Sequence, residues 1–300
     1  MQVFNFPFRA MGSVCEVRLY AEDKQRAQVL ADAAQSEVRR LEKIYSRYLD
    51  DSVTTRINRS AGYAAGVEVD AETAGLLDYA QAAWEQSEGL FDITSGVLRR
   101  VWDFKAARIP AQSEIDNTLK LIGWDKLSWQ RPHLVLPRAG MELDFGGYVK
   151  EYAADRAAQA CRDVGARQGF VDLGGDISLI GPHPDGAPWE VGVRNPRNPE
   201  VAIAQIALTS GGIASSGDYE RFFERDGKRY CHILNPLTGW PVNSLAGVSV
   251  VAEQCLIAGT ATTIAMLKGS SEGPQWLEEL GLRHLYIDTR GKIGGNLATR

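Results

Sequence analysis

Two pairs of adjacent glycines constrain the fold of this chain more than any other feature. Gly146-Gly147 lies between a segment of strand character and a helical pattern over residues 148–164. Gly174-Gly175 follows a short predicted strand at residues 169–173. Glycine adopts backbone conformations that other residues avoid, and it lets the main chain approach a ligand closely. The sequence therefore predicts two tight turns at junctions of regular elements, and each turn is a candidate binding loop.

The other segments show no regular alternation of strands and helices. Apolar residues recur at helical spacing after Asp23, and further helices are predicted from near Asp70 to near Gly89 and over residues 258–267. Strand patterns cover residues 13–20, 189–194, 202–208, 247–252 and 284–288. Strands outnumber helices without a βαβ order, which predicts an α+β fold rather than a doubly wound sheet. The absence of repeats and of linker-like segments predicts one continuous domain over residues 1–300.

The composition argues against several classes of protein. The net charge is -5 and no run of lysine or arginine is present, so a nucleic-acid partner is not expected. The longest apolar stretches, such as residues 247–252, are far shorter than the roughly 20 residues that cross a bilayer. The cysteines lack the C-x-x-C spacing of zinc sites, so we expect buried free thiols. The first residues do not resemble a signal peptide, which favours a cytoplasmic protein, or a periplasmic one if a signal sequence was removed.

The segment around the first glycine pair contains groups that can bind phosphate. Asp144 precedes the glycines, and Lys150 follows them at the predicted start of a helix. The free N–H groups of a helix start and the compact charge of a lysine both favour a phosphate. The alternative is a tight turn with a solvated Lys150. Neither glycine segment matches G-x-G-x-x-G or G-x-x-x-x-G-K-[ST], so the sequence does not support a Rossmann fold or a P-loop.

Four further places contain candidate residues, and three of them have a structural alternative. His232 lies just before a predicted turn and could act as a base, hold a phosphate, or be purely structural. Thr262 and Thr263 could offer oxygens to a cation or a phosphate, or they could cap a helix. Asp92 could accept hydrogen bonds from an adenine or cap the next helix. Residues 215–218 are expected to form a turn that lines a ligand, since no G-x-S-x-G motif surrounds their serines.

Taken in order, these segments resemble the ApbE family, the FAD:protein FMN transferases, over nearly the whole chain. The resemblance rests on several ordered segments rather than on one motif. They are residues 11–13, 45–48 with Asn58, 89–94, 144–155, 171–176, 216–219, 232–239 and 258–269. The resemblance implies an α+β fold similar to the T-fold group. It also implies two closely packed lobes, with FAD in a cleft between them and Mg2+ beside the pyrophosphate.

The resemblance implies a reaction and the residues that take part in it. Family members cleave FAD at the pyrophosphate, pass FMN to a threonine or serine of a partner flavoprotein, and release AMP. Lys150 is expected to steady the phosphates, and His232 matches a histidine that assists proton transfer from the acceptor hydroxyl. The positions that match the family's flavin-contacting residues are Met11, Tyr48, Leu90, Phe91, Asp92, Asp144, Lys150 and Ile233. Soft or aromatic side chains such as Met11, Tyr48 and Phe91 suit flat rings.

The chain departs from the family at the metal site. The family uses a backbone carbonyl, at the position of Gly147, with an aspartate and a threonine four residues after that aspartate. Here Gly259 occupies the aspartate position, while Thr263 remains with Thr262 beside it. Neither hydroxyl carries the negative charge that a hard cation favours, which predicts a weakened or absent Mg2+ site. Glu151 is new at a family glycine position; it either replaces the missing carboxylate or faces solvent on the helix surface, where glutamates usually lie.

Two functions are therefore open from the sequence. The first is an active FAD:protein FMN transferase that acts on an acceptor flavoprotein with a threonine or serine target. The second is a non-catalytic FAD-binding carrier or maturation protein that has lost the Mg2+ carboxylate. We place the transferase first, because the positions that contact the ligand are kept and one catalytic element is missing.

Overall fold

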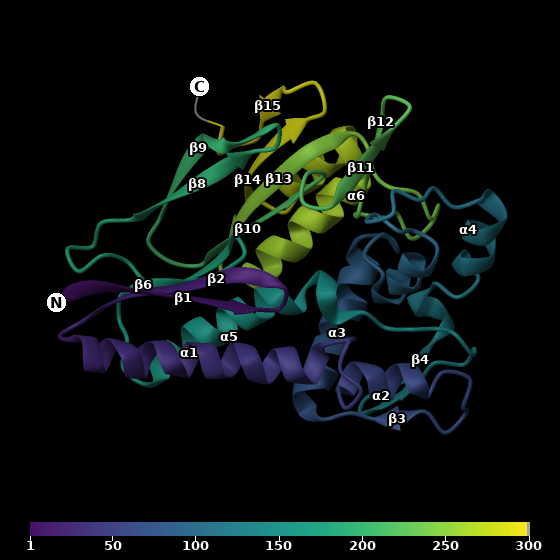
Figure 1. Cartoon of the computed structure of the whole chain (residues 1–300), viewed down its shortest axis with the longest axis horizontal. Coiled ribbons are helices and arrows are strands. Elements are labelled where there is room, and N and C mark those ends of the chain that lie inside the picture. The colour runs from purple at the N-terminus through teal and green to yellow at the C-terminus, as the bar shows by residue number, and fades with distance from the viewer. Residues whose placement is uncertain (299–300) are drawn as a thin grey trace.

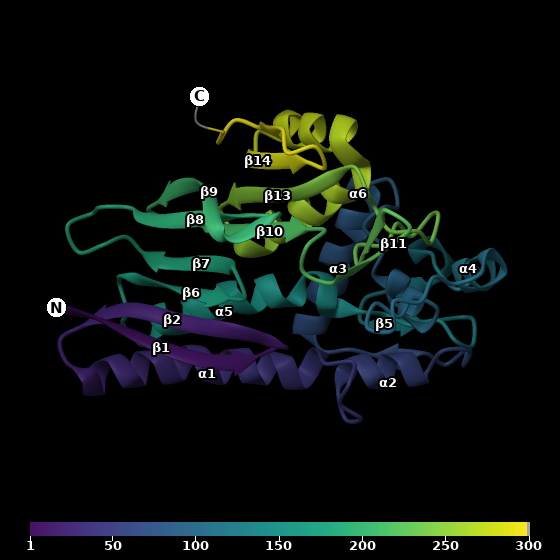
Figure 2. The same cartoon turned by 45° about the horizontal axis from the view of Figure 1, so that its top comes forward.

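The computed structural model describes residues 1–298 of the chain, and it confirms the α+β class. Its main element is an eight-stranded sheet with the order β1-β2-β6-β7-β10-β13-β14-β15, shown in Figure 1 and, tilted forward, in Figure 2. The strands are β1 (Gln2–Ala10), β2 (Ser13–Ala21), β6 (Gly169–Leu173), β7 (Asp176–Gly181), β10 (Gly212–Gly217), β13 (Leu245–Ala252), β14 (Arg283–Asp288) and β15 (Ile293–Gly294). Each pairing in this sheet is antiparallel, as is typical of an α+β fold.

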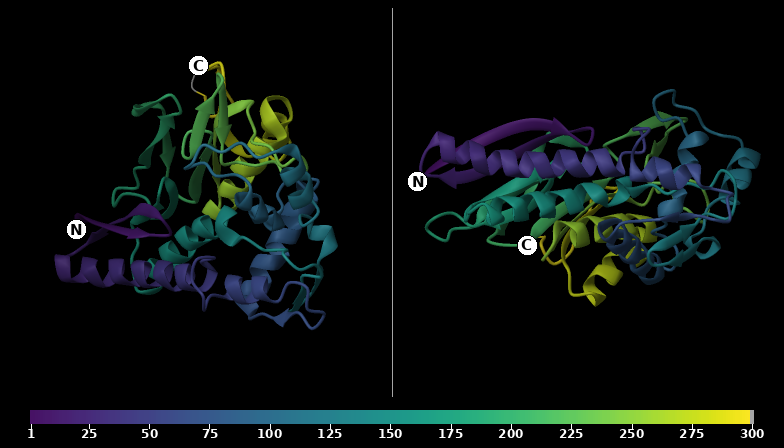
Figure 3. Two further views of the ribbon diagram at one scale, coloured as in Figure 1. Left: turned by 45° about the vertical axis from the view of Figure 1, so that its right-hand side comes forward. Right: turned by 90° about the horizontal axis from the view of Figure 1, so that it is seen from below.

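Three long helices pack on the sheet: α1 (Lys24–Tyr45), α5 (Val149–Asp163) and α6 (Cys255–Glu279). Seen from below in Figure 3, they lie side by side, with α1 next to α5 and α5 next to α6. The stripe predicted for α1 is buried, and Asp23 caps its first turn by accepting a hydrogen bond from the Arg26 N–H at 2.8 Å. The predicted helix over residues 258–267 is longer in the structure, and its backbone breaks at Gly269.

A two-stranded ribbon covers the other face of the sheet. Its strands are β8 (Trp189–Asn195) and β9 (Asn198–Leu208). Trp189 and Ile206 of the ribbon pack with Ile177 and Leu179 of β7 in one apolar cluster. Strand β7 is therefore buried on both faces, which places it at the centre of the molecule.

The remaining elements form the right-hand part of Figure 1. They are α2 (Val53–Arg59), β3 (Val67–Glu68), α3 (Ala71–Gln86), α4 (Gln112–Leu119), β4 (Ser128–Gln130), β5 (His133–Val135), β11 (Phe222–Arg225) and β12 (Lys228–Cys231), with the 3-10 turns η1 (Ile93–Arg100), η2 (Trp124–Lys126) and η3 (Phe145–Gly147). A smaller core lies here around Trp102, whose indole N–H donates to the Gly239 carbonyl at 2.8 Å. This contact holds the segment that follows His232 against residues 97–122.

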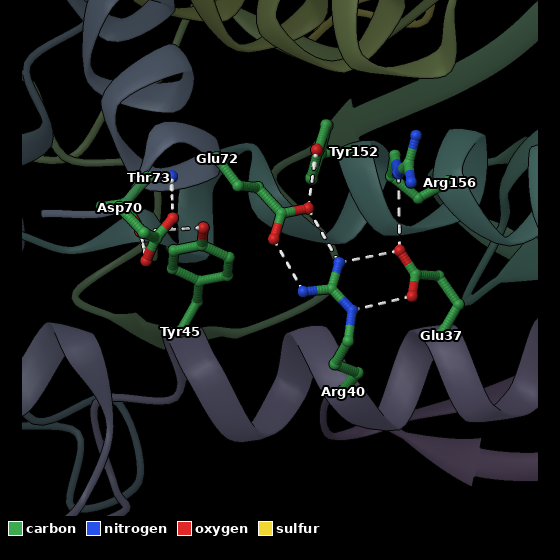
Figure 4. Close-up of polar contacts among 8 residues, drawn as sticks. All are labelled: Glu37, Arg40, Tyr45, Asp70, Glu72, Thr73, Tyr152 and Arg156. Carbon is green, nitrogen blue, oxygen red and sulfur yellow. Dashed lines mark hydrogen bonds and ion pairs between the residues drawn. The ribbon is translucent and has the colours of Figure 1, made fainter.

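A polar network joins α1, α3 and α5 (Figure 4). Arg40 of α1 donates to Glu37 at 2.8 Å and to Glu72 of α3 at 2.7 Å. The Tyr152 hydroxyl of α5 donates to the same Glu72 carboxylate at 2.9 Å. The Glu72 carboxylate of α3 thus accepts hydrogen bonds from both α1 and α5 and links the three helices.

The prediction of a turn at residues 215–218 is wrong for residues 215–217, and only Asp218 lies in a turn. Ser215 and Gly217 lie in β10 and pair with Ser249 and Gly247 of β13. Serine and glycine favour turns, but β10 pairs with β13 along its whole length, and this pairing outweighs the local preference. The expectation of buried free thiols is confirmed for all four cysteines. Within residues 1–298, no helix is long and apolar enough to cross a membrane.

Candidate functional site

The first glycine pair forms the 3-10 turn η3, which leads directly into α5. Asp144 caps this turn, and its Oδ1 accepts a hydrogen bond from the Gly146 N–H at 2.9 Å. The helical ladder then begins with the Tyr152 N–H, which donates to the Tyr148 carbonyl at 3.1 Å. The carbonyl of Gly147 therefore precedes the ladder, and a Cβ on this residue would meet no atom within 4 Å. The predicted tight turn is confirmed, and it leaves the Gly147 carbonyl outside the helical ladder.

Lys150 connects the two glycine segments. Its ammonium donates to the Leu173 carbonyl at 3.1 Å and forms an ion pair with Asp176, and these two residues flank the second glycine pair. The other oxygen of Asp176 accepts a hydrogen bond from the Ser215 N–H of β10 at 3.1 Å. The alternative of a solvated Lys150 is therefore wrong. A contact between Lys150 and a phosphate stays a prediction.

Met11 lies in the turn between β1 and β2. Met11 and Gly12 have φ values of 50° and 71°, the pair of positive values that a two-residue type I′ hairpin turn requires. Glu42 of α1 accepts the Met11 N–H at 2.5 Å. A Cβ at Gly174 would lie 2.9 Å from the Ser13 side chain, so this hairpin turn packs directly on the second glycine pair.

Tyr48 presents an open aromatic surface and is 79% exposed. Arg47 donates to its hydroxyl at 3.1 Å, lies 5.1 Å from its ring centroid and also pairs with Asp144. This hydrogen bond lowers the pKa of Tyr48, and the charges of Arg221 and Arg99 act in the same direction. A flat ring can stack on such a surface, next to the first glycine pair.

The segment from Leu90 to Asp92 is more enclosed. Leu90 is half-buried, and Phe91 lies in the apolar core. Asp92 caps η1 and accepts hydrogen bonds from the N–H groups of Thr94 at 2.8 Å and Trp124 at 2.9 Å. Burial raises the pKa of Asp92. The capping interpretation of Asp92 is confirmed, whereas flavin or adenine contacts of these residues stay predictions.

His232 holds a neutral imidazole at neutral pH. Burial, reinforced by the charge of Arg221, lowers the pKa of His232 to about 4. Its Nδ1 is buried and has no hydrogen-bond partner among the described residues. The backbone N–H of His232 donates to the Arg221 carbonyl at 2.9 Å, and Ile233 packs half-buried against the main core. A neutral imidazole with a free nitrogen can accept a proton.

Three hydroxyl groups from β10 and α6 lie together. Thr262 is fully buried and donates to the Gly259 carbonyl at 2.8 Å. The Ser216 hydroxyl lies 2.8 Å from that of Thr262 and 3.3 Å from that of Thr263. The N-cap of α6 is Gln254, so these threonines lie beyond the first turn and the capping alternative is wrong. Hydroxyl oxygens can contribute to a cation site, but across residues 1–298 no group of three His, Cys, Asp or Glu side chains could hold a metal by itself.

Comparisons with known proteins show which family the chain belongs to. The model of the ApbE family matches residues 11–286. The chain belongs to the ApbE family. Similar sequences include the FAD:protein FMN transferases of Treponema pallidum (30% identical, over 97% of this chain and 86% of the relative) and Salmonella typhimurium (29% identical, over 95% and 84%).

Solved ApbE structures confirm the fold. The ApbE protein from Thermotoga maritima has a TM-score of 0.90 at 31% identity, over 98% of this chain and 97% of that protein. The flavinyl transferase ApbE from Pseudomonas stutzeri has a TM-score of 0.84 at 28% identity, over 97% and 93% of the two chains. The expected ApbE-like α+β architecture is therefore confirmed.

From the sequence, two residues of the candidate site in this ApbE protein were missed, Asp176 and Arg47, and so was the contact that a third, Ser216, makes. Asp176 pairs with Lys150, Ser216 joins the threonine hydroxyls, and Arg47 lies against Tyr48. Asp176 and Ser216 lie inside segments that carry the family resemblance, and Arg47 directly precedes Tyr48, so each had a signal. The sequence did not show which distant residue each of them contacts.

Proposed function

We propose that this protein is an FAD:protein FMN transferase, which moves FMN from FAD to a threonine or serine of an acceptor flavoprotein and releases AMP. The observation that carries the proposal is the match to relatives of that name over 94% to 97% of the chain. A match of this extent includes both glycine segments, the hydroxyl cluster and His232. The likeness therefore covers the candidate site as well as the fold.

In the proposed reaction, the acceptor hydroxyl oxygen bonds to the phosphorus of the FMN half of FAD. The pyrophosphate P–O bond to AMP breaks, and its electron pair stays on the AMP phosphate. The hydroxyl proton passes to His232, whose imidazole is neutral at pH 7 because burial lowers its pKa. Lys150 and Asp176 hold the two glycine loops together around the pyrophosphate. This arrangement would fix FAD in place for the attack.

The donor groups on this chain fit Mg2+. They are the Gly147 carbonyl, the hydroxyls of Thr262 and Thr263, and the carboxylate of Glu151, which has one buried oxygen without a partner among the described residues. Proteins often bind Mg2+ through one or two carboxylates together with substrate phosphates, so a complete protein cage is not required. When bound, the ion neutralises charge on the pyrophosphate.

We also infer that Gly259 stands at the aspartate position of the family's metal site. The interpretation of Glu151 as a solvent-facing residue is wrong, because only 9% of it is exposed. Its side chain lies against Gly259, so a carboxylate is still present beside α6. The loss of this charge favoured a non-catalytic carrier, and the Glu151 carboxylate beside Gly259 supports the transferase instead.

The test incubates the protein with FAD, Mg2+ and the FMN-free acceptor of a related transferase, and measures the intact mass of the acceptor. We expect a gain of one FMN, and no gain in an acceptor whose target threonine is replaced by alanine. An acceptor of unchanged mass beside intact FAD would instead support the carrier.

A variant pair tests the role of His232 within this assay. His232→Gln is expected to slow transfer about 100-fold or more, the usual effect of losing a general base, while FAD binding persists. His133→Gln, in β5, is the control and should transfer at the wild-type rate. Transfer by His232→Gln at the wild-type rate would exclude the proposed base.

A further inference from the structure

Glu151 has an unusual position for a glutamate on a helix. It lies in the first turn of α5, yet it is 9% exposed, and its Oε2 has no hydrogen-bond partner within the described part of the chain. Its other oxygen lies 3.6 Å from the Lys150 ammonium, which is longer than a direct hydrogen bond. A buried carboxylate oxygen without a partner is unfavourable. This position therefore favours a ligand that supplies the missing interaction.

Gly259 provides the space for this carboxylate. A Cβ at Gly259 would lie 2.4 Å from Cγ, 2.9 Å from Cδ and 3.2 Å from Oε1 of Glu151. An aspartate therefore does not fit at position 259 while Glu151 has this conformation. Gly259 lies in the regular part of α6, so space rather than backbone conformation requires a glycine here. The carboxylate of α5 fills the volume that a side chain of α6 would otherwise occupy.

Other oxygen donors flank this position from both helices. Thr262 and Thr263 follow Gly259 by three and four residues, a spacing that puts side chains on one face of a helix. On the side of α5, the Gly147 carbonyl precedes Glu151 by one turn and lies outside the helical ladder. Carboxylate, carbonyl and hydroxyl oxygens are the preferred ligands of hard divalent cations.

We propose that Glu151 is the anionic protein ligand of a divalent-cation site. The absence of a side chain at Gly259 leaves the space in which this carboxylate of α5 lies, where a ligand from α6 would otherwise be. The proposal rests on the proposed function, because the pyrophosphate of FAD supplies the remaining ligands. A role for Glu151 as mere counter-ion of Lys150 is less well supported. Lys150 already contacts Asp176 and the Leu173 carbonyl.

The first test measures the binding of Mn2+, an EPR-visible substitute for Mg2+, to the protein saturated with FAD and without acceptor. Glu151→Gln keeps the shape of the side chain and removes its charge. We expect it to raise the Mn2+ Kd at least about tenfold, since even the loss of an outer-shell partner has that effect. The control is Asp163→Asn, which removes an exposed carboxylate at the other end of α5 and should leave the Kd unchanged.

The second test moves the carboxylate back to α6. Glu151→Gly combined with Gly259→Asp should restore the Mn2+ Kd to within about threefold of wild type, because each carboxylate reaches the same volume. Gly259→Asp alone should destabilise the fold, since its Cβ meets Glu151. If these variants fail to fold, anomalous scattering from Mn2+ in wild-type crystals with FAD decides, and an oxygen of Glu151 should lie about 2.0 to 2.4 Å from the metal.

The outcomes separate this proposal from the proposed function. Equal Mn2+ affinity in Glu151→Gln and wild type, no Mn2+ binding by wild type with FAD, or a metal away from Glu151 would each overturn the relocated ligand. If Glu151→Gln changes the affinity for FAD but not that for Mn2+, Glu151 acts as a counter-ion of Lys150, and this result would also overturn the proposal. None of these results depends on transfer to an acceptor, which tests the function separately.

Discussion

At the scale of single residues, His232 couples folding to pH. Burial lowers its pKa to about 4 in the folded chain, whereas an unfolded histidine titrates near 6.5. Between these values the unfolded chain takes up a proton that the folded chain does not. Its contribution to stability is therefore complete above pH of about 6.5 and is lost as the pH falls toward 4.

This difference predicts the acid behaviour of the free energy of unfolding. Between pH 7 and pH 4, wild type should lose about 1 to 3 kcal/mol more than His232→Gln, in which the titrating group is absent. Denaturant titrations at a series of pH values measure the difference. Parallel pH profiles for the two proteins would mean that His232 is not held neutral by the fold.

Two glycines isolate the effect of backbone conformation, because at neither would an added Cβ touch another atom. A Cβ at Gly12 or at Gly75 would meet no atom within 4 Å, but Gly12 has a φ of 71° whereas Gly75 lies inside α3. Gly12→Ala should lower the free energy of unfolding by about 1 kcal/mol, since L-residues disfavour positive φ. Gly75→Ala should raise it by about 0.5 to 1 kcal/mol through helix propensity. Chemical denaturation checks both, and shifts of the same sign would contradict the turn geometry.

The sequence indicated residues of the site better than it indicated their contacts. Lys150 was identified beside the first glycine pair, but its partner Asp176 comes from the second. From the sequence, Asp92 could cap a helix or accept hydrogen bonds from an adenine, because both roles use the same carboxylate oxygens. The burial of Glu151 depends on Gly259, more than a hundred residues away, so no local pattern could predict it.

At the scale of elements, Arg40 should stabilise the packing of α1 on α3 and α5. Its side chain is 40% exposed, so solvent screens the ion pairs, and Arg40→Met should lower the free energy of unfolding by about 1 kcal/mol at pH 7. Arg39→Met is the control, because among residues 1–298 the Arg39 side chain makes only a 3.4 Å hydrogen bond to Gln35. Urea titrations of both variants beside wild type measure the effect.

The same network predicts a pH dependence for the effect of Arg40→Met. Hydrogen bonds from Arg40 lower the pKa values of Glu37 and Glu72. The stabilisation is therefore present above the ordinary carboxyl pKa and is lost as the pH falls through the lowered values. Wild type and Arg40→Met should converge in strong acid, and a constant difference would assign the effect to packing of the arginine stem instead.

Elements with a strong local sequence pattern were predicted closely. Elements that form because they pair with distant strands were not. The amphipathic stripe and the Asp23 cap located α1, and the strand pattern located β6. Strand β10 was missed because its glycines and serines have little strand preference. Its pairing with β7 and β13 supplies what the local sequence lacks. The order of strands in the sheet likewise depends on pairings between distant segments.

At the scale of the whole molecule, the four buried cysteines report on global unfolding. Burial raises the pKa of Cys231 to about 11 and that of Cys161 to about 12, so both thiols stay protonated at neutral pH. A thiol reagent needs an accessible thiolate. We expect no rapid labelling of the native protein and complete labelling in denaturant, at a rate that follows unfolding. Rapid labelling of any native cysteine would reveal local opening of that region.

We infer that this chain, with its carboxylate on α5, transfers FMN. The most direct measurement compares the AMP released with the FMN gained by the acceptor in one reaction with FAD and Mg2+. We expect one AMP for each acceptor that carries FMN. Bound FAD that stays intact without AMP, or AMP and free FMN beside an unmodified acceptor, would contradict it.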